Sequence, residues 1–232
     1  AKVSKTSGTT VDLTGYTPTR DGYTFDGWYS NSALTIKVTS IKLTSNTTIY
    51  AKWTAKSDMS FTDVADKAYY RDAVEWAVDN GITKGTTATT FSPNATCTRA
   101  QAVTFLWRAA GSPEPETRAM PFTDIPVGSY YYDAVLWAVE NGITKGTSDT
   151  TFSPNMTCTR AQIVAFLWRS EKSPAAGTAN PFADVKSDAY YADAVLWAAK
   201  EDITKGTTNT TFSPGADCTR AQIVTFLWRC KK

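Results

Sequence analysis

The chain has 232 residues, a formal net charge of +2, four cysteines and no histidine. Because histidine is absent, Ser-His-Asp catalysis, Cys-His catalysis and histidine-ligated zinc are excluded. The small net charge argues against nucleic acid or an anionic membrane as partner, and no apolar stretch approaches the roughly 18 residues that a membrane span requires. The apolar fraction of 42% is enough to bury a real core.

Residues 1–56 are rich in β-branched and aromatic residues, as in Tyr23-Thr24-Phe25 and Thr48-Ile49-Tyr50. This composition predicts a small β-rich module over 1–56. The chain starts at Ala1 without a signal-peptide pattern, so we expect it to be a piece of a longer protein with a further domain upstream.

Three units, 61–109, 122–170 and 182–230, align without a gap. They share F-x-D, Y-Y-x-D-A-V-x-W-A, I-T-K-G-T, T-T-F-S-P and C-T-R-A-Q-x-V-x-F-L-W-R. The stretches between them contain Pro, Ala and Gly without apolar periodicity, which is typical of linkers. The predicted repeat domains are 57–111, 112–172 and 173–232, and the predicted fold class of the whole chain is α+β.

Each repeat predicts two helices. In the first repeat, one helix covers about 72–80 and ends at Gly81, and the second follows Thr98, which forms a capping-box pattern with Gln101. In the third repeat Asp202 replaces the glycine and tolerates the left-handed conformation less well. Apolar residues surround more than half of the second helix, so we expect it to pack deeply against its counterparts. The segment between the helices predicts a loop with a short strand.

The tryptophans of the repeats lie at helical spacing among apolar neighbours, which predicts core positions. They are Trp76, Trp107, Trp137, Trp168, Trp197 and Trp228.

The cysteines at equivalent positions, Cys97, Cys158 and Cys218, are predicted to be small buried apolar residues without a disulfide. Cys230 lies one helix away from Cys218, too far for a disulfide. Without Cys-x-x-Cys spacing, no metal site is predicted.

The repeats resemble S-layer homology domains. The residues that carry this resemblance are Phe61-x-Asp63, the turn 81–85, Phe91-Ser92-Pro93 and, above all, Thr98-Arg99-Ala100-Gln101 with its two recurrences. The segment at about 10–53 resembles the β-grasp-like Listeria-Bacteroides repeats of bacterial surface proteins, through residues 22–29 and 48–53.

The resemblance implies a pseudo-threefold helical bundle with prongs, formed by the three repeats. It also implies non-covalent anchoring of an exported bacterial protein to the cell wall. The implied partner is secondary cell-wall polysaccharide, a peptidoglycan-linked anionic glycan that often ends in a pyruvylated sugar, bound in grooves between repeats. The implied location is extracellular, at the cell surface, with no cofactor and no membrane insertion.

The family's ligand-binding arginine corresponds to Arg99, Arg160 and Arg220. A cation in the first turn of a helix is unfavourable by roughly 0.3–1 kcal/mol. One explanation is that its guanidinium and exposed helix N–H groups receive an anion together. The alternative is purely structural: each arginine pairs with the aspartate of its own repeat, Asp63, Asp124 or Asp184.

Two further sets recur in all repeats. Lys84, Lys145 and Lys205 would add a second positive charge, and Tyr69, Tyr130 and Tyr190 would offer an apolar face to a sugar ring. Structural roles remain open for both sets, since half-buried packing is common for tyrosine. Asp202 and Gly215 replace residues of the other repeats, so we expect the groove that uses third-repeat loops to differ in affinity.

A second candidate function is self-association of the repeats into a surface lattice through protein–protein contacts. An enzyme is not expected, because outside the repeated residues no Asp/Glu pair suggests glycoside hydrolysis. No catalytic residue is therefore predicted.

Overall fold

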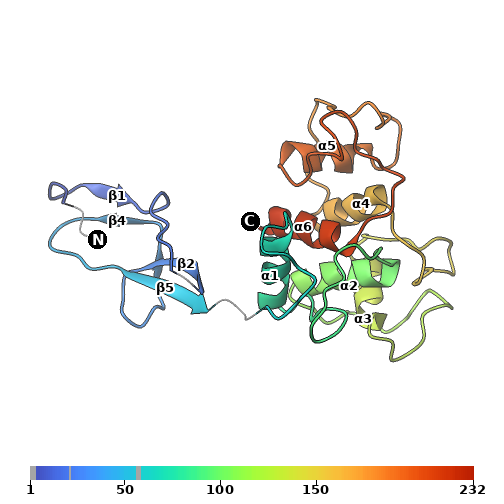
Figure 1. Cartoon of the computed structure of the whole chain (residues 1–232), viewed down its shortest axis with the longest axis horizontal. Coiled ribbons are helices and arrows are strands. Elements are labelled where there is room, and N and C mark those ends of the chain that lie inside the picture. The colour runs from blue at the N-terminus through green and yellow to red at the C-terminus, as the bar shows by residue number, and fades with distance from the viewer. Residues whose placement is uncertain (1–3, 21, 56–58) are drawn as a thin grey trace. The chain divides into compact units, whose positions relative to one another are not determined.

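The computed structural model describes residues 4–20, 22–55 and 59–232. The chain divides into two compact units, Ala1–Asp58 and Met59–Lys232, drawn in Figure 1. The ends of the predicted N-terminal module, 1–3 and 56, lie outside the described residues.

The first unit is built of short antiparallel strands, as predicted from its composition. Strands β1 (Thr10–Asp12) and β4 (Ser40–Lys42) form one pair. Strands β3 (Lys37–Val38), β2 (Tyr23–Tyr29) and β5 (Tyr50–Ala55) form a three-stranded sheet in that order. A bulge between Phe25 and Gly27 shifts the register of β2 against β5.

Aromatic residues hold the first unit together. The ring centroid of Phe25 lies 5.3 Å from those of both Trp28 and Trp53. The indole N–H of Trp28 donates to the carbonyl of Tyr16 at 2.8 Å. These contacts join the three-stranded sheet to the segment that follows β1.

The second unit contains two helices per repeat, as predicted. The first helices are α1 (Arg71–Asp79), α3 (Tyr132–Glu140) and α5 (Ala192–Lys200). The second helices are α2 (Arg99–Ala109), α4 (Arg160–Ser170) and α6 (Arg220–Lys231). The predicted first helix at 72–80 is one residue out of register with the observed α1.

The predicted helix ends are confirmed. Thr98, Thr159 and Thr219 each cap a second helix in a complete capping box with Gln101, Gln162 or Gln222. Gly81 and Gly142 adopt φ values of 67° and 66° after the first helices. Asp202 takes φ 55° at the same place, so the third repeat keeps this backbone turn without a glycine.

The helices pack in a cyclic order. The second helices α2, α4 and α6 contact one another at the centre of the unit (Figure 1). Outside them, α3 packs on α2, α5 on α4, and α1 on α6. The first helix of each repeat therefore covers the second helix of the preceding repeat, and the first repeat covers the last. The expected deep packing of the second helices is confirmed.

The six tryptophans of the repeats lie in or against the core, as predicted. Trp137 and Trp197 are buried, and the other four are partly buried and pack against buried residues.

The connection between the two helices of a repeat differs from its prediction. Within residues 59–232 the structure has only isolated bridges and no strand in these segments, because their backbone groups bond within the loop and to the neighbouring repeat rather than along a ladder. In the first repeat the carboxylate of Asp63 accepts the N–H groups of Phe91 and Ser92 at 2.8 and 2.7 Å. Gly85 has φ 86°, and a Cβ there would lie 2.5 Å from both the Phe61 ring and the Thr90 carbonyl oxygen.

Three cysteines form the centre of the cycle. Cys97, Cys158 and Cys218 are fully buried free thiols, as predicted. Their backbones form a closed ring: the N–H of Cys97 donates to Cys218, that of Cys158 to Cys97, and that of Cys218 to Cys158, each at 2.9 Å. Burial raises the pKa of the Cys158 and Cys218 thiols to about 12.

Candidate functional site

The arginine at the start of each second helix contacts the next repeat in the cycle. The Nε of Arg99 and of Arg160 donates at 2.8 Å to the carbonyl oxygen of Phe152 and Phe212, respectively. Arg220 closes the cycle by donating to Phe91 of the first repeat at 2.9 Å. The three arginines are only 3–4% exposed.

Two phenylalanine rings contact each guanidinium. The Cζ of Arg99 lies 4.7 Å from the ring centroid of Phe152 and 5.3 Å from that of Phe166. Arg160 and Arg220 make the same pair of contacts with Phe212 and Phe226, and with Phe91 and Phe105. Such cation–π contacts contribute about 2 kcal/mol when desolvated, so the arginines also join the repeats structurally.

The helix N–H groups are not open to an anion, which corrects the expectation from the helix dipole. The N–H groups of Arg99 and Ala100 donate to the carbonyls of Met156 and Pro154 in the next repeat, at 2.9 and 3.0 Å. The other two second helices are bound in the same way by loops of the third and the first repeat. The positive helix end therefore binds the neighbouring repeat.

The structural alternative is also wrong in its detail. Asp63 accepts backbone N–H groups of its own repeat, and no ion pair joins it to Arg99 within the described residues. Asp63 lies within electrostatic reach of Arg220, which belongs to the third repeat. Asp124 and Asp184 stand in the same relation to Arg99 and Arg160.

Part of each guanidinium lacks a good partner. The Nη2 atoms of Arg160 and Arg220 are buried without a hydrogen bond in the described chain. The Nη2 of Arg99 donates to the hydroxyl of Thr144 at a long 3.4 Å. Burial lowers the pKa of all three arginines. Because an unsatisfied buried donor costs about 1–3 kcal/mol, Arg160 and Arg220 each have capacity for a further acceptor.

The predicted tyrosines lie beside these arginines and come from the remaining repeat. Tyr69, Tyr130 and Tyr190 are 62%, 59% and 62% exposed. Partial burial raises the pKa of Tyr190, while the positive charges of Arg169 and Arg99 lower it. Partial burial likewise raises the pKa of Tyr69 and Tyr130, while the charges of Arg160 and Arg229 lower that of Tyr69, and those of Arg108 and Arg220 lower that of Tyr130.

The sites therefore draw on all three repeats. We call each set an inter-repeat cluster: an arginine of one repeat, the loop of the next, and a tyrosine of the third. The clusters are built around Arg99 with Phe152 and Tyr190, Arg160 with Phe212 and Tyr69, and Arg220 with Phe91 and Tyr130.

The predicted lysines are exposed on the same loops. Lys84, Lys145 and Lys205 each follow a buried threonine: Thr83, Thr144 or Thr204. Among the described residues, none of the three lysines forms an ion pair. They are available to a charged ligand at the loops.

Sequence reasoning missed a second arginine in each repeat. The Nη1 atoms of Arg108, Arg169 and Arg229 donate to the carbonyls of Ile82, Ile143 and Ile203 at 3.0–3.2 Å. Each of these arginines therefore binds the isoleucine at the start of the loop in its own repeat. The phenylalanine at the end of the same loop is bound by an arginine of another repeat. The signal was present, because these arginines end the shared F-L-W-R in all three units.

Within the described residues, no group of three His, Cys, Asp or Glu side chains could hold a metal ion. No described helix combines the length and apolar character that crossing a bilayer demands.

Family models match most of the chain. The S-layer homology domain matches residues 60–103, 121–164 and 181–224. The Listeria-Bacteroides repeat domain matches residues 1–52. Both agree with the resemblances carried by the sequence motifs.

Similar proteins include surface proteins and enzymes. The chain is 32% identical over 157 residues to a surface-layer 125 kDa protein of Lysinibacillus sphaericus, covering 66% of the chain and 13% of that protein. It is 30% identical over 196 residues to an amylopullulanase of Thermoanaerobacterium thermosulfurigenes, covering 80% of the chain and 10% of that enzyme. A cell surface protein of Thermoanaerobacter kivui is 31% identical over 114 residues, which are 47% of the chain and 15% of that protein.

The chain thus spans about a tenth of the length of the first two relatives, and the part shared with the enzyme-named proteins is the anchoring region rather than the whole enzyme. S-layer homology domains anchor surface proteins to the bacterial cell wall, and this function class matches the surface proteins among the relatives. The chain belongs to the S-layer homology domain family, with three such domains after a Listeria-Bacteroides repeat, and its place is the bacterial cell surface.

Proposed function

We propose that the chain anchors a longer exported protein by binding an anionic secondary cell-wall polysaccharide at the three inter-repeat clusters. The observation that carries the proposal is the unpaired Nη2 of Arg160 and Arg220, with an exposed tyrosine beside each arginine and an exposed lysine on the loop that it binds. A carboxylate such as that of a pyruvylated sugar is a suitable acceptor, because charge-assisted bonds to guanidinium are about twice as strong as neutral ones.

Each member of a cluster has a separate role in this proposal. The arginine supplies a buried positive charge. Lys84, Lys145 or Lys205 supplies a second, exposed positive charge on the loop that the arginine binds. Tyr69, Tyr130 or Tyr190 offers its ring to the apolar face of a sugar, since its phenol is free to keep one edge in water. No residue is assigned a catalytic role.

We further propose that the domains at 57–111, 112–172 and 173–232 are related by a pseudo-threefold axis, with the loops as prongs between which the glycan lies. The cyclic order of helix contacts supports this arrangement, since each repeat makes the same contacts with the next. The groove that uses third-repeat loops is expected to differ in affinity from the other two. The backbone turn at Asp202 is the same as at the glycines of the other repeats, so the difference would come from the charge of Asp202 near Lys205.

The test is calorimetric titration of the chain with wall polysaccharide from its source organism, before and after acid removal of pyruvyl groups. Binding that is lost after this treatment supports an anion-binding cluster. Retained binding points to a neutral sugar or to another anion. Since the arginines also join the repeats, rim variants are more informative than arginine variants.

The decisive variants are Tyr130→Ala and Lys84→Gln, which belong to one cluster and to exposed side chains. We expect each to weaken binding about 10-fold, because one contact of roughly 1.4 kcal/mol is lost, without a change in melting temperature. Lys186→Gln, at another exposed lysine, is the matched control and should bind as the unaltered chain does.

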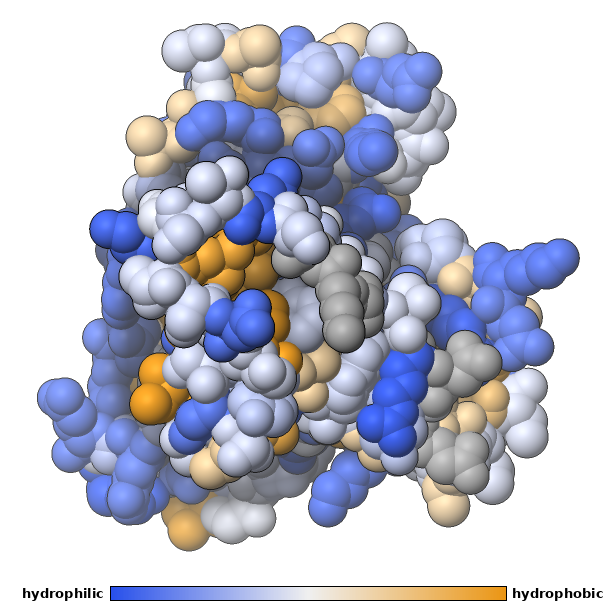
Figure 2. Space-filling view, turned by 90° about the vertical axis from the view of Figure 1, so that its left-hand side faces the viewer, coloured by the Kyte–Doolittle hydropathy of each residue, from blue (hydrophilic) through white to orange (hydrophobic). Residues whose placement is uncertain are grey.

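Self-association into a lattice remains the competing function. On the face shown in Figure 2, hydrophilic side chains predominate and hydrophobic ones form small separate groups. Absence of glycan binding together with concentration-dependent association in ultracentrifugation would replace our proposal with this one.

A further inference from the structure

The positive charge of the chain is concentrated in its β-rich unit. Residues 1–58 contain seven lysines and arginines against four aspartates, whereas residues 59–232 contain 17 lysines and arginines against 18 acidic residues. The small net charge of the whole chain therefore combines a basic unit of +3 with a helical unit of −1. Because a net charge of one sign attracts partners of the opposite sign, the β-rich unit is the part of the chain that attracts anions.

The aspartates of the β-rich unit do not neutralise its cations. Asp12 accepts the N–H and the hydroxyl of Thr14 at 2.9 and 2.7 Å, and Asp26 accepts the hydroxyl of Thr54 at 2.6 Å. Within residues 4–20 and 22–55, no lysine or arginine forms an ion pair. These cations are therefore free to contact an external anion.

Two of the cations share one face of the three-stranded sheet. Lys37 of β3 is directly opposite Tyr29 of β2, and Lys52 of β5 is directly opposite Gly27 of β2. Tyr50 of β5 is also opposite Tyr29. Since opposite residues share a face and side chains alternate along a strand, these five residues lie on one side of the sheet. We call this side the lysine face.

The other side of the sheet carries the aromatic cluster. The ring of Phe25 contacts those of Trp28 and Trp53 there, because the bulge after Phe25 keeps Phe25 and Trp28 on the same side. The indole of Trp28 also bonds to Tyr16, which covers part of this cluster. The apolar contacts of the sheet and its two lysines are therefore on opposite faces.

The two lysine side chains extend over β2. A Cβ on Gly27 would lie 2.5 Å from the Cε and 3.2 Å from the Nζ of Lys37, so the ammonium of Lys37 lies above this glycine. The Nζ of Lys52 lies 5.4 Å from the ring centroid of Tyr29. Opposite residues have Cβ atoms about 5 Å apart, which brings the Lys37 ammonium within about 9 Å of the Lys52 Cβ. Two positive charges thus share the surface above the middle strand.

We propose that the lysine face binds an acidic saccharide chain, whose carboxylate or phosphate groups contact Lys37 and Lys52 while a sugar ring contacts Tyr50. Tyr50 is 38% exposed, and an amphipathic ring of this kind suits a surface that is apolar at one edge and wet at the other. Since the place of the chain is the bacterial cell surface, an acidic saccharide is a polyanion of suitable chemistry there. The site lies apart from the inter-repeat clusters, and the proposal does not depend on them.

The test follows the backbone amide resonances of the whole 232-residue chain during titration with short oligomers. An oligogalacturonate supplies carboxylates, an oligo(glycerol phosphate) supplies phosphates, and a maltooligosaccharide is the neutral control. We expect the amides of Gly27, Lys37 and Lys52 to shift with at least one acidic oligomer and not with the neutral one, and the oligomer that shifts them identifies the acid group. Unmoved amides at these residues would overturn the proposal, whatever happens at the clusters. Larger shifts with a short DNA duplex than with either saccharide would replace it with nucleic-acid binding.

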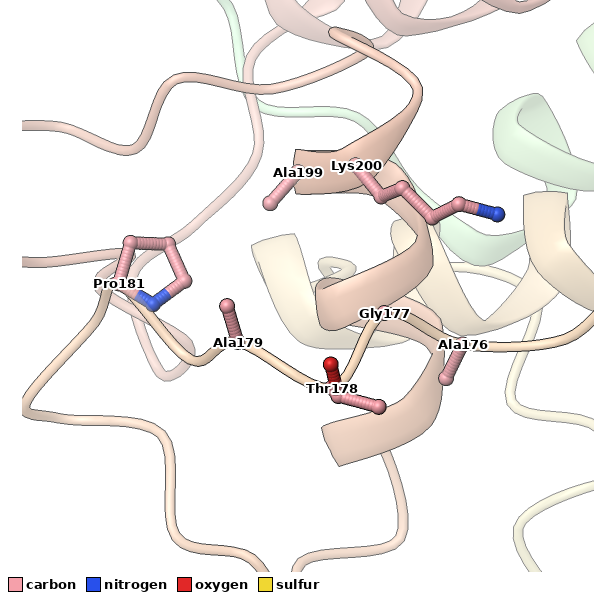
Figure 3. Close-up of a pocket in the computed structure, with 7 residues that line it drawn as sticks. All are labelled: Ala176, Gly177, Thr178, Ala179, Pro181, Ala199 and Lys200. Carbon is pink, nitrogen blue, oxygen red and sulfur yellow. The ribbon is translucent and has the colours of Figure 1, made fainter.

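Charge-removing variants locate the binding on the lysine face. The double variant Lys37→Gln/Lys52→Gln should bind the acidic oligomer about 10-fold more weakly, because two exposed charge contacts are lost. Lys5→Gln, at an exposed lysine outside the sheet, is the matched control in the same unit. Lys200→Gln is a second control, since Lys200 lines an open hollow at the end of α5 (Figure 3) and pairs with Glu201 at 3.2 Å.

Both controls should bind as the unaltered chain does. Unchanged tryptophan fluorescence of the double variant would show that its sheet remains folded. An equal loss of affinity in Lys5→Gln would show that net charge alone attracts the oligomer, and this result would overturn the assignment to the lysine face.

Discussion

The β-rich unit and the helical unit keep their cores in different ways. Among residues 4–55 only Leu13 and Tyr29 are buried hydrophobics, and the aromatic contacts of Phe25 stay within the unit. In residues 59–232 one buried cluster runs through all three repeats. In that unit each repeat bonds to the next through backbone hydrogen bonds and through a buried arginine. A substitution in the β-rich unit should therefore destabilise that unit alone, whereas a substitution between repeats should destabilise the whole helical unit.

We expect the largest loss of stability from Arg220→Ala, in the helical unit. The substitution removes the bond between the last and the first repeat, together with two ring contacts. It also leaves the Phe91 carbonyl unpaired, so we expect a loss of about 3 kcal/mol in the free energy of unfolding. Thermal melts followed by the helical circular-dichroism signal measure it.

Arg118→Ala is the control for that experiment. Arg118 is an exposed arginine with ion pairs to Glu114 and Asp133, and exposed pairs contribute about 1 kcal/mol or less. Equal melting temperatures for the two variants would show that the cycle of arginines does not join the repeats.

Phe25→Ala tests the other side of the comparison. Its half-buried ring contacts Trp28 and Trp53, so we expect the β-rich unit to lose about 2 kcal/mol. The indole resonances of Trp28 and Trp53 should report this loss, while the melting temperature of the helices stays the same. A parallel loss of helical signal would mean that the two units are coupled.

Alkaline pH should weaken the helical unit through its thiols, because all four cysteines lie in this unit. The thiols of Cys158 and Cys218 have a pKa of about 12 when folded, against 9.0 in the unfolded chain. Above pH 9 the unfolded chain loses protons that the folded chain retains, so stability falls as the pH rises from 9 toward 12. The limit is about 1.4 kcal/mol per pH unit for each thiol.

Melts at a series of pH values check this dependence, with Cys158→Ala expected to reduce the slope. A slope that is the same in the variant would assign the alkaline loss to other groups.

The smallest effect is expected from Thr159→Ala. Thr159 accepts from the Gln162 N–H at 3.3 Å at the start of α4, and loss of such a cap costs about 1 kcal/mol. Chemical denaturation of the variant is compared with Ser187→Ala, an exposed hydroxyl outside the helices. A loss of several kcal/mol would show that the cap also supports the contact between repeats.

Many residues of the candidate site could be predicted because they recur in each repeat. Three aligned units made Arg99, Lys84 and Tyr69 visible as members of repeated sets without any coordinates. Recurrence alone did not distinguish their surroundings: the arginine is 3% exposed and Tyr69 is 62% exposed. Arg108 recurs in the same way, but an arginine at the C-terminal end of a helix is ordinarily favourable and so does not by itself indicate a site.

Local chemistry in the sequence determined the helix ends, the capping boxes, the free buried cysteines and the β-rich character of residues 1–56. These features depend on residues that lie close together in the chain, or on side-chain polarity alone. The tertiary structure decided which repeat satisfies which: Met156 receives the N–H of Arg99, Asp63 binds its own loop, and Tyr190 lies beside Arg99 from the third repeat. These pairings depend on the packing of α1 against α6, which closes the cycle of repeats. The aligned sequences are compatible with any order of contacts between repeats. Only packing in three dimensions selects this order.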